Sequence, residues 1–338
     1  MGKVISSSLE MELSISLLPA YYGDCIFLSY DGFNILIDGG TSRTYQDLHD
    51  RRNPNKALKK LVEQLQCDNQ HIDLLVVTHV DDDHIGGIKE WFENNYPADG
   101  FIREIWMNDN IELKDTGSLQ NSPKNAGSLL ELWKERGQLY RNDIVMGVEE
   151  DRGPFHIRVL SPLVRYRNTV AKKIQSTLKN TGVSLSRYKI SLKDLYAESW
   201  QSNPISVENR ASIALELSIP GEKVLMLGDA HIEDVMDGLD IFYPDKEEQI
   251  NYTVIKLSHH GSKNNFDPNF LKRVRANEFL VSTNGDYFNH PDKEVIAQII
   301  CNSDSRIEFN YQNRIDSLFT EQDYKDFPDL HERTFATT

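Results

Sequence analysis

The chain has 338 residues, of which 39% are hydrophobic and 26% charged, a balance that excludes a disordered or low-complexity protein. Its formal net charge of −15 argues against general attraction to nucleic acids or anionic membranes, although a local basic patch remains possible.

The cysteines, the apolar runs and the first residues indicate the cellular location that the sequence predicts. Cys25, Cys67 and Cys301 are far apart and odd in number, so neither a disulfide framework nor a zinc knot is indicated, and the reducing cytoplasm is expected. The longest apolar runs fall well short of the roughly 20 residues that span a bilayer, so no membrane segment is expected. Residues 1–11 lack the apolar core of a secretion signal and are expected to form a flexible leader.

The first half of the chain alternates strand and helix patterns. Residues 11–20, 25–30 and 33–40 predict a strand meander, with Asp31-Gly32 as a hairpin signal. A helix is predicted next, because apolar side chains recur at helical spacing at Leu58, Leu61, Val62 and Leu65. Residues 72–79 predict a strand covered on both faces. An acidic loop and a helix at 85–94 follow it.

The remaining elements repeat this order. Strands are predicted at 101–108 and 155–162, around a helix at 128–137, and later at 211–220, 223–231, 252–262 and 278–285, with a helix near 268–275. Strands followed by strand-helix units thus occur twice. The pattern predicts an α/β fold of the αββα sandwich type, with two sheets back to back and loops from each half at one edge. We expect a single domain over residues 12–338 with an insertion at 163–206.

Residues 78–87, THVDDDHIGG, place metal-ligand residue types directly after a strand: His79, Asp81, Asp83 and His84. Carboxylates packed this closely repel one another unless a cation lies among them. A solvated acidic turn is the alternative. Two further apolar strands end in the same residue types, the first at Asp229 and the second at His259 and His260, and three such strand ends favour a metal site.

These motifs resemble those of a metallo-β-lactamase-fold hydrolase. The usual HxHxDH motif reads HVDDDH here, with aspartate in place of the second histidine, and is similar to the HxDxDH version in the C-terminal domain of ComEC/Rec2-type DNA-uptake proteins and their stand-alone relatives. Other parts of that pattern follow in order: Tyr22-Gly23-Asp24, Leu36 to Gly40, Asn209 with Ser212, Leu227 to Ala230, His259 to Ser262, and His290-Pro291.

The resemblance implies two divalent metal ions. His79, Asp81 and Asp229 would hold one, and Asp83, His84, Asp229 and one of the two adjacent histidines the other; we assign His259 as that ligand. The histidine that usually completes the first site has no counterpart, and Asn209 occupies its region. Because the donor set is rich in oxygen, Mn²⁺ or Mg²⁺ suits it as well as Zn²⁺.

The resemblance also implies roles in catalysis. A hydroxide bridging the metals would attack, Asp83 would orient it, and His260 and His290 would stabilise the developing charge or protonate the leaving oxygen. Asp38 and Asn209 would support the ligands from behind. Ser262 would donate to a phosphate or cap a helix. For His290 and Asp38 ordinary turn roles are the alternative.

Residues 163–193 carry eight Lys/Arg and no Asp or Glu. Tyr166 and Tyr188 lie among these cations, so the segment could bind single-stranded nucleic acid, with Lys172, Lys173 and Lys179 as phosphate contacts. The alternative is a solvated loop or a patch docked on the protein's own acidic surface.

The sequence therefore predicts a metal-dependent phosphodiesterase or nuclease that acts on DNA or RNA. One alternative is a small-molecule hydrolase, such as a lactonase, thioesterase or cyclic-nucleotide phosphodiesterase. The other is a metal-bound subunit that serves a protein partner.

Overall fold

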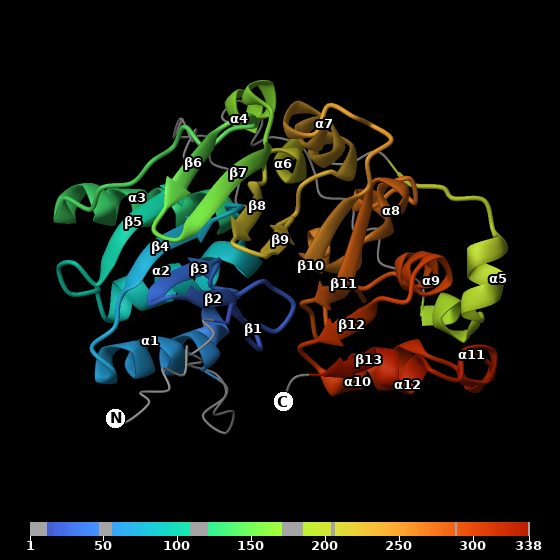
Figure 1. Cartoon of the computed structure of the whole chain (residues 1–338). Helices are drawn as coiled ribbons and strands as arrows, with labels where there is room; N and C mark the ends of the chain where they lie inside the picture. Colours follow the sequence, from blue (N-terminus) through green and yellow to red (C-terminus); the bar gives the residue numbers. More distant parts are fainter. Residues whose placement is uncertain are drawn as a thin grey trace, which may run out of the picture.

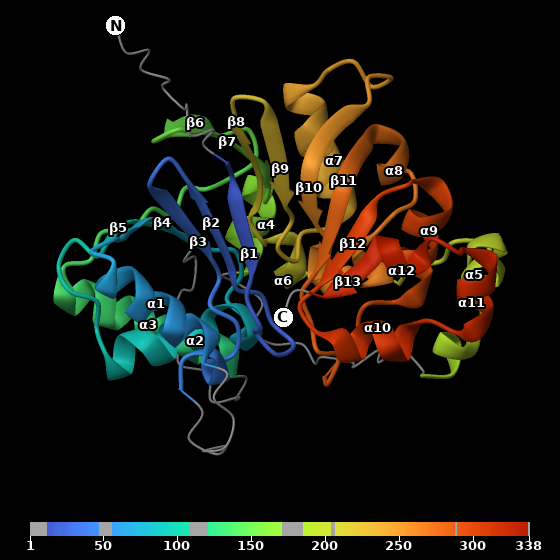
Figure 2. The same cartoon turned by 60° about the horizontal axis from the view of Figure 1, so that its bottom comes forward.

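The computed structural model describes residues 12–46, 56–108, 121–170, 185–203, 207–287 and 289–336. These residues form two sheets that face each other, with helices on their outer sides (Figures 1 and 2). The predicted α/β sandwich of two sheets is confirmed. The expected leader and Lys172, Lys173 and Lys179 lie outside the described residues.

The first sheet has five strands in chain order: β1 (Ser14–Leu17), β2 (Ile26–Tyr30), β3 (Phe33–Ile37), β4 (Ile72–Val77) and β5 (Ile102–Met107). The predicted meander is present, because β1, β2 and β3 pair antiparallel. From β3 to β5 the pairing is parallel, so these strands end at one edge.

The second sheet has eight strands in reverse chain order: β6 (Glu149–Arg152), β7 (Phe155–Ser161), β8 (Ala214–Ile219), β9 (Glu222–Met226), β10 (Ile250–Lys256), β11 (Val274–Val281), β12 (Arg306–Phe309) and β13 (Thr334–Ala336). Strands β6 to β9 pair antiparallel and β9 to β13 parallel. Strand β13, close to the described C-terminal end, completes the outer edge.

Three helices cover the first sheet: α1 (Ala57–Cys67), α2 (Asp82–Asn94) and α3 (Asn121–Arg136). The described remainder of the chain contributes α4 (Val164–Val170), α5 (Leu192–Ala197), α6 (Val207–Arg210), α7 (Ile232–Phe242), α8 (Phe270–Arg273), α9 (Lys293–Asn302), α10 (Gln312–Leu318), α11 (Glu321–Asp326) and α12 (Leu330–Arg333). Short 3-10 turns are η1 (Ser42–Thr44), η2 (Leu185–Lys189), η3 (Ser258–Gly261) and η4 (Lys263–Asn265). Within the described part of the chain, no helix has the length and apolar character that crossing a membrane requires.

Strand β4 shows how the core forms, since successive strand side chains point to opposite faces. Leu74 and Val76 pack between the two sheets. Leu75 and Val77 pack outward against the helices of the first half. A third apolar cluster lies between the second sheet and helices that include α5, α7 and α9. Both faces of each sheet are therefore buried near the site, which agrees with the predicted continuous apolar run.

Two predicted boundaries are wrong. Helix α2 begins at Asp82 rather than near residue 85, so Asp83 and His84 stand in its first turn instead of in a loop. Carboxylates at a helix start suit the positive end of its dipole. The helix predicted near 268–275 ends at Arg273, because the chain enters β11 at Val274.

Within the predicted basic insertion, α4, η2 and α5 are described. Tyr188 is only 6% exposed, and its hydroxyl donates to the carbonyl of Pro291 at 2.8 Å. The expectation that Tyr188 stacks on bases is therefore wrong, since its ring belongs to the core. Arg187 pairs with Glu198 and Glu294, and Lys193 lies 3.3 Å from Asp326. These cations dock on the protein's own carboxylates, as the alternative for this segment supposed.

Candidate metal centre

The donor residues meet because parallel strands of both sheets end together. In the second sheet Met226, Lys256 and Leu280 are paired in register near the ends of β9, β10 and β11. The segments after these strands therefore leave the sheet at one edge. The first sheet delivers the segment after β4 to the same place, where the amide N–H of Ile213 donates to the carbonyl of Thr78 at 2.9 Å.

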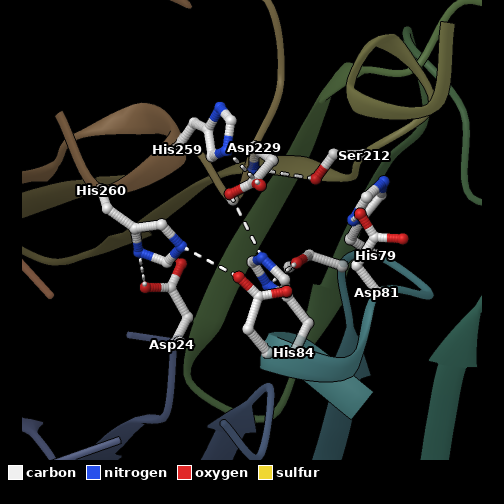
Figure 3. A network of polar contacts seen from close by, with 12 residues as sticks. Asp24, His79, Asp81, His84, Ser212, Asp229, His259 and His260 are labelled. Carbon is white, nitrogen blue, oxygen red and sulfur yellow. Dashed lines mark hydrogen bonds and ion pairs between the residues drawn. The ribbon is translucent and has the colours of Figure 1, made fainter. Parts of the chain in front are cut away.

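His84 is the centre of the cluster (Figure 3). It takes part in three groups whose ligand atoms all lie within 4.8 Å of one another. The groups are His79–His84–Asp229, Asp83–His84–His260 and Asp24–Asp38–His84. The structure thus brings together side chains from five separate segments of the chain, and all of them are buried.

The first group contains the expected ligands His79 and Asp229. The Nε2 atom of His84 lies 3.3 Å from Oδ1 of Asp229, and the rings of His79 and His84 are 5.5 Å apart. Asp81 lies beside this group, with Oδ2 3.5 Å from Nδ1 of His79, and its side chain is 43% exposed. Asp81 can therefore reach an ion that His79 binds, from the solvent side.

The second group contains His260 rather than His259. The Nδ1–H of His260 donates to the carbonyl of Ser282 at 2.7 Å, which turns Nε2 toward Asp83 Oδ2, 3.4 Å away. An imidazole fixed through one nitrogen and open at the other is the usual arrangement of a metal-binding histidine. The geometry therefore favours His260 as the ligand.

His259 lies on the other side of Asp229 and is the more accessible histidine. Its side chain is 20% exposed, against 1% for His260, and its Nε2 is 3.7 Å from Asp229 Oδ2. Its Nδ1 contacts Asn265 Oδ1 at 2.9 Å and the Asn209 amide at 3.1 Å. Asn209 thus contacts His259, and its expected support of a metal ligand stays a prediction.

His290 completes this side of the site. Its ring centroid lies 5.3 Å from that of His259, and Nδ1 is 3.7 Å from Asp292 Oδ2. Burial lowers the pKa of His290 well below its usual range, and His259 and His260 add to the effect. The ring is therefore neutral near pH 7. A neutral imidazole can donate a hydrogen bond to developing charge, but it is a poor source of a full proton.

Asp38 fixes the central histidine. Its Oδ2 accepts from Nδ1–H of His84 at 2.8 Å, and its Oδ1 accepts the amide N–H of Thr78 at 2.7 Å. The supporting role predicted for Asp38 requires these contacts, and the role itself stays a prediction. Asp38 itself has a φ of 59°, in the left-handed region that few non-glycine residues adopt, and His259 and His260 share that feature. Such strain is concentrated where function requires a fixed geometry.

Asp24 plays an equivalent part for His260. Its Oδ1 lies 3.3 Å from His260 Nδ1, and its other oxygen forms an ion pair with Lys256, a lysine with no exposed surface. Gly23 makes this possible, because a Cβ at that position would stand 2.0 Å from the carbonyl oxygen of Asp83. The loop before Asp24 therefore lies directly on the start of α2.

Ser262 is buried and stands at the N-cap of η4, without a side-chain hydrogen bond to the turn.

Four residues that support the cluster were not identified as site residues from the sequence: Lys256, Thr78, Ser282 and Asn265. A lysine within the apolar run of β10 was the one available signal, since a buried charge needs a partner. The others act through backbone groups or amides, which no pattern reveals.

The residues fit a divalent cation. Donor atoms of the cluster are buried and make no hydrogen bond to any described residue: both nitrogens of His79, Nε2 of His84, Nε2 of His260 and Oδ1 of Asp229. Buried polar atoms are normally satisfied. Imidazole nitrogen and carboxylate oxygen are the ligand types of Zn²⁺ and Mn²⁺. The cluster therefore has the composition and spacing of a metal site.

The charges around His84 and His260 also favour a divalent cation in the cluster. Burial lowers the pKa of His84, but Asp229, Asp38 and Asp83 outweigh it and hold the pKa well above its usual range. Burial also lowers the pKa of His260, but Asp24 and Asp83 raise it to about 9. Positive charge is thus stabilised at the centre of the cluster, and a divalent cation would supply that charge without protonating the ligands.

Comparisons with known proteins match part of the chain. A family model described as the Metallo-beta-lactamase superfamily matches residues 18–158. The chain is 22% identical over 159 residues to ComE operon protein 3 of Bacillus subtilis (strain 168), a match that covers 43% of this chain and 20% of that protein. This chain thus aligns with about a fifth of the length of that relative.

Two solved structures are also similar. The metallo-beta-lactamase fold protein YhfI from Bacillus subtilis has a TM-score of 0.44 and 11% identity, over 88% of this chain and 96% of that chain. Igni18, a metallo hydrolase from Ignicoccus hospitalis, has a TM-score of 0.39 and 11% identity, over 96% of this chain and 95% of that chain.

Proposed function

We propose that this chain, which has the metallo-beta-lactamase fold and the metal-dependent hydrolase character of the matched superfamily, is a phosphodiesterase that cleaves DNA or RNA. The observation that carries the proposal is the set of histidine and carboxylate groups that converge on His84. Their richness in oxygen favours the hard cations used in phosphoryl transfer. The resemblance of the HVDDDH segment to ComEC/Rec2-type proteins is the reason for proposing nucleic acid as the substrate.

We propose one change to the expected roles. His79, Asp81 and Asp229 would hold one cation, and Asp83, His84, Asp229 and His260 the other. His259 then takes the place beside the substrate that was expected for His260, because it is the histidine that solvent reaches. When bound, two such cations lower the pKa of a water molecule to near neutrality and stabilise the charge of the attacked group.

The chain's own residues supply the rest. Asp38 and Asp24 hold His84 and His260 in one orientation each, so the donors need not reorganise. Asp83 accepts a hydrogen bond from the nucleophile and aligns it. His259 can give a proton to the leaving oxygen, and His290 can donate a hydrogen bond to the phosphoryl oxygens. No side chain has to form a covalent intermediate.

A direct test uses purified protein with Mn²⁺, Zn²⁺ or Mg²⁺ and labelled single-stranded DNA, RNA and bis(4-nitrophenyl) phosphate. Asp83→Ala and His84→Ala should each lower kcat at least about 100-fold while the folded spectrum is retained. His156→Ala is the matched control, because His156 lies on β7 and pairs with Glu149 and Asp151 away from the site. Retained turnover in both site variants would overturn the mechanism.

A small-molecule hydrolase is the second candidate. It is favoured by one observation, namely that Arg187 and Lys193 are already paired with carboxylates and offer little to a polyanion. Hydrolysis of lactones or thioesters, without cleavage of any phosphodiester, would replace the first proposal with this one.

A further inference from the structure

Two tyrosines, Tyr22 and Tyr287, form a stacked pair. The ring centroids of Tyr22 and Tyr287 lie 5.3 Å apart with an interplanar angle of 26°, and Tyr287 is 59% exposed. A single exposed aromatic side chain is ordinary on a protein surface. What makes this pair informative is that its two loops also contact residues of the candidate metal cluster.

Tyr22 is joined to the first half of the site. It precedes Gly23 and Asp24, and the N–H of Asp24 donates to the carbonyl of Asp83 at 3.0 Å. Burial, followed by the charges of Asp83 and Asp82, raises the pKa of the Tyr22 phenol. Tyr22 is therefore close enough to Asp83 and Asp82 for their charges to act on its phenol.

Tyr287 is joined to the second half. Its segment begins at Ser282, whose carbonyl accepts from His260, and leads to His290. The N–H of Asn284 donates to the carbonyl of Tyr21 at 2.7 Å, which ties this segment to the loop that carries Tyr22. The aromatic pair is thus fixed to the same two loops that orient His260 and Asp83.

A cation stands close to the pair. The guanidinium of Arg43 lies over the ring of Tyr21, 4.0 Å from its centroid, and its charge lowers the pKa of Tyr22. Planar aromatic faces beside a cation are the two components of a site that binds single-stranded nucleic acid, where bases stack and phosphates are neutralised.

We infer that Tyr22 and Tyr287 form a stacking platform for an unpaired nucleobase that flanks the scissile phosphodiester, so that the substrate is single-stranded nucleic acid. This inference rests on the proposed function. A base within a duplex is stacked on both faces and offers only its edges in the grooves. An unpaired base can lay its face on an exposed ring, whatever its sequence.

The experiment compares Tyr287→Ala and Tyr287→Trp on a single-stranded oligonucleotide, its duplex, and an abasic oligonucleotide of equal length. Tyr287→Ala should raise KM for the single strand by about 5- to 150-fold. Tyr287→Trp should retain the wild-type KM, and neither variant should change KM for the abasic strand or the metal content. Tyr196→Ala is the matched control, because Tyr196 is 39% exposed on α5, where its hydroxyl donates to Asn302.

The outcomes separate the two proposals. An unchanged KM for Tyr287→Ala, or equal cleavage of duplex and single strand, overturns the platform while phosphodiester hydrolysis stands. Absence of cleavage by the wild type overturns the function instead, and fluorescence anisotropy of the labelled single strand then tests the platform alone. Loss of binding in Tyr287→Ala supports it, and equal binding to the abasic strand contradicts it.

Discussion

Asp38 accepts a hydrogen bond from His84 at 2.8 Å, and neither side chain is exposed to solvent. Because Nδ1 of His84 is held in this way, Nε2 faces Asp229 and remains available as a ligand atom for a metal ion. A carboxylate that orients a ligand histidine also raises the basicity of the ring.

Removal of this support should weaken metal binding without removing a ligand. Asp38→Ala should lower the affinity for Mn²⁺ or Zn²⁺ by about 10- to 100-fold. Asp38→Asn should lose less, because an amide oxygen can still accept from His84. Metal titration followed by calorimetry measures both, and equal affinities in all three proteins would contradict the assigned role.

The adjacent histidines His259 and His260 should differ in function, one in catalysis and the other in metal binding. His260→Ala should reduce the number of bound metal ions per chain, since its Nε2 faces Asp83. His259→Ala should keep the metal content and lower kcat by about 100-fold or more, as expected on removal of a general acid. Elemental analysis of the two variants beside their kinetics decides between the histidines. The reverse pattern would return the ligand role to His259.

The buried pair of Asp24 and Lys256 should matter for stability. Lys256→Met removes the ammonium group paired with the buried Asp24 carboxylate, so the free energy of unfolding should fall by about 3–5 kcal/mol. The double variant Asp24→Asn/Lys256→Met should recover part of this loss, because no isolated charge remains. Urea unfolding of metal-free protein provides the measurement. An additive double variant would argue against the pairing.

These residues show what the sequence could and could not establish. The ends of three strands predicted His79, Asp83, His84 and Asp229 at one edge, because strand periodicity and parallel pairing determine where side chains leave a sheet. The choice between His259 and His260 could not be made, since it depends on which ring a distant carbonyl, that of Ser282, happens to fix.

The other features that the sequence did not predict correctly have a similar cause. The Asp24–Lys256 pair joins residues separated by 232 positions, and no local pattern reports such a contact. The start of α2 was placed too late because consecutive aspartates are typical of turns as well as of first helical turns. The core role of Tyr188 was missed because its basic neighbours suggested a surface.

A pH effect is expected away from the metal centre. Glu278 and Glu308 lie on neighbouring strands, and burial followed by the hydrogen bond to Glu308 raises the pKa of Glu278 to about 7. The folded protein thus keeps a proton that the unfolded chain has already lost. This stabilisation is fully present below the usual glutamate pKa and is lost as the pH rises through 7.

Glu278→Gln should therefore remove a decline in unfolding free energy between about pH 5 and pH 8. Thermal unfolding at several pH values in that range tests this, with Glu63→Gln on the exposed side of α1 as control. The expectation fails if the wild type and Glu278→Gln keep parallel stability profiles.

The basic segment offers a further prediction. Replacing Lys172, Lys173 and Lys179 together with Glu should weaken binding of single-stranded nucleic acid and flatten its salt dependence, by about 0.7 in slope for each phosphate that the variant no longer neutralises. The matched control replaces Lys59, Lys60 and Lys89, which lie on α1 and α2 and make the same change in total charge. Unchanged affinity would leave the segment as a solvated or self-docked loop.

The division of the donors between the two sheets has a consequence for the timing of metal uptake. His79, Asp83 and His84 emerge early in synthesis, whereas Asp229 and His260 come more than a hundred residues later. A nascent chain in which only the first sheet has folded has part of the ligand set, and it would bind a cation weakly. The proposed site would therefore be complete only after the segments that carry Asp229 and His260 have docked on the first half.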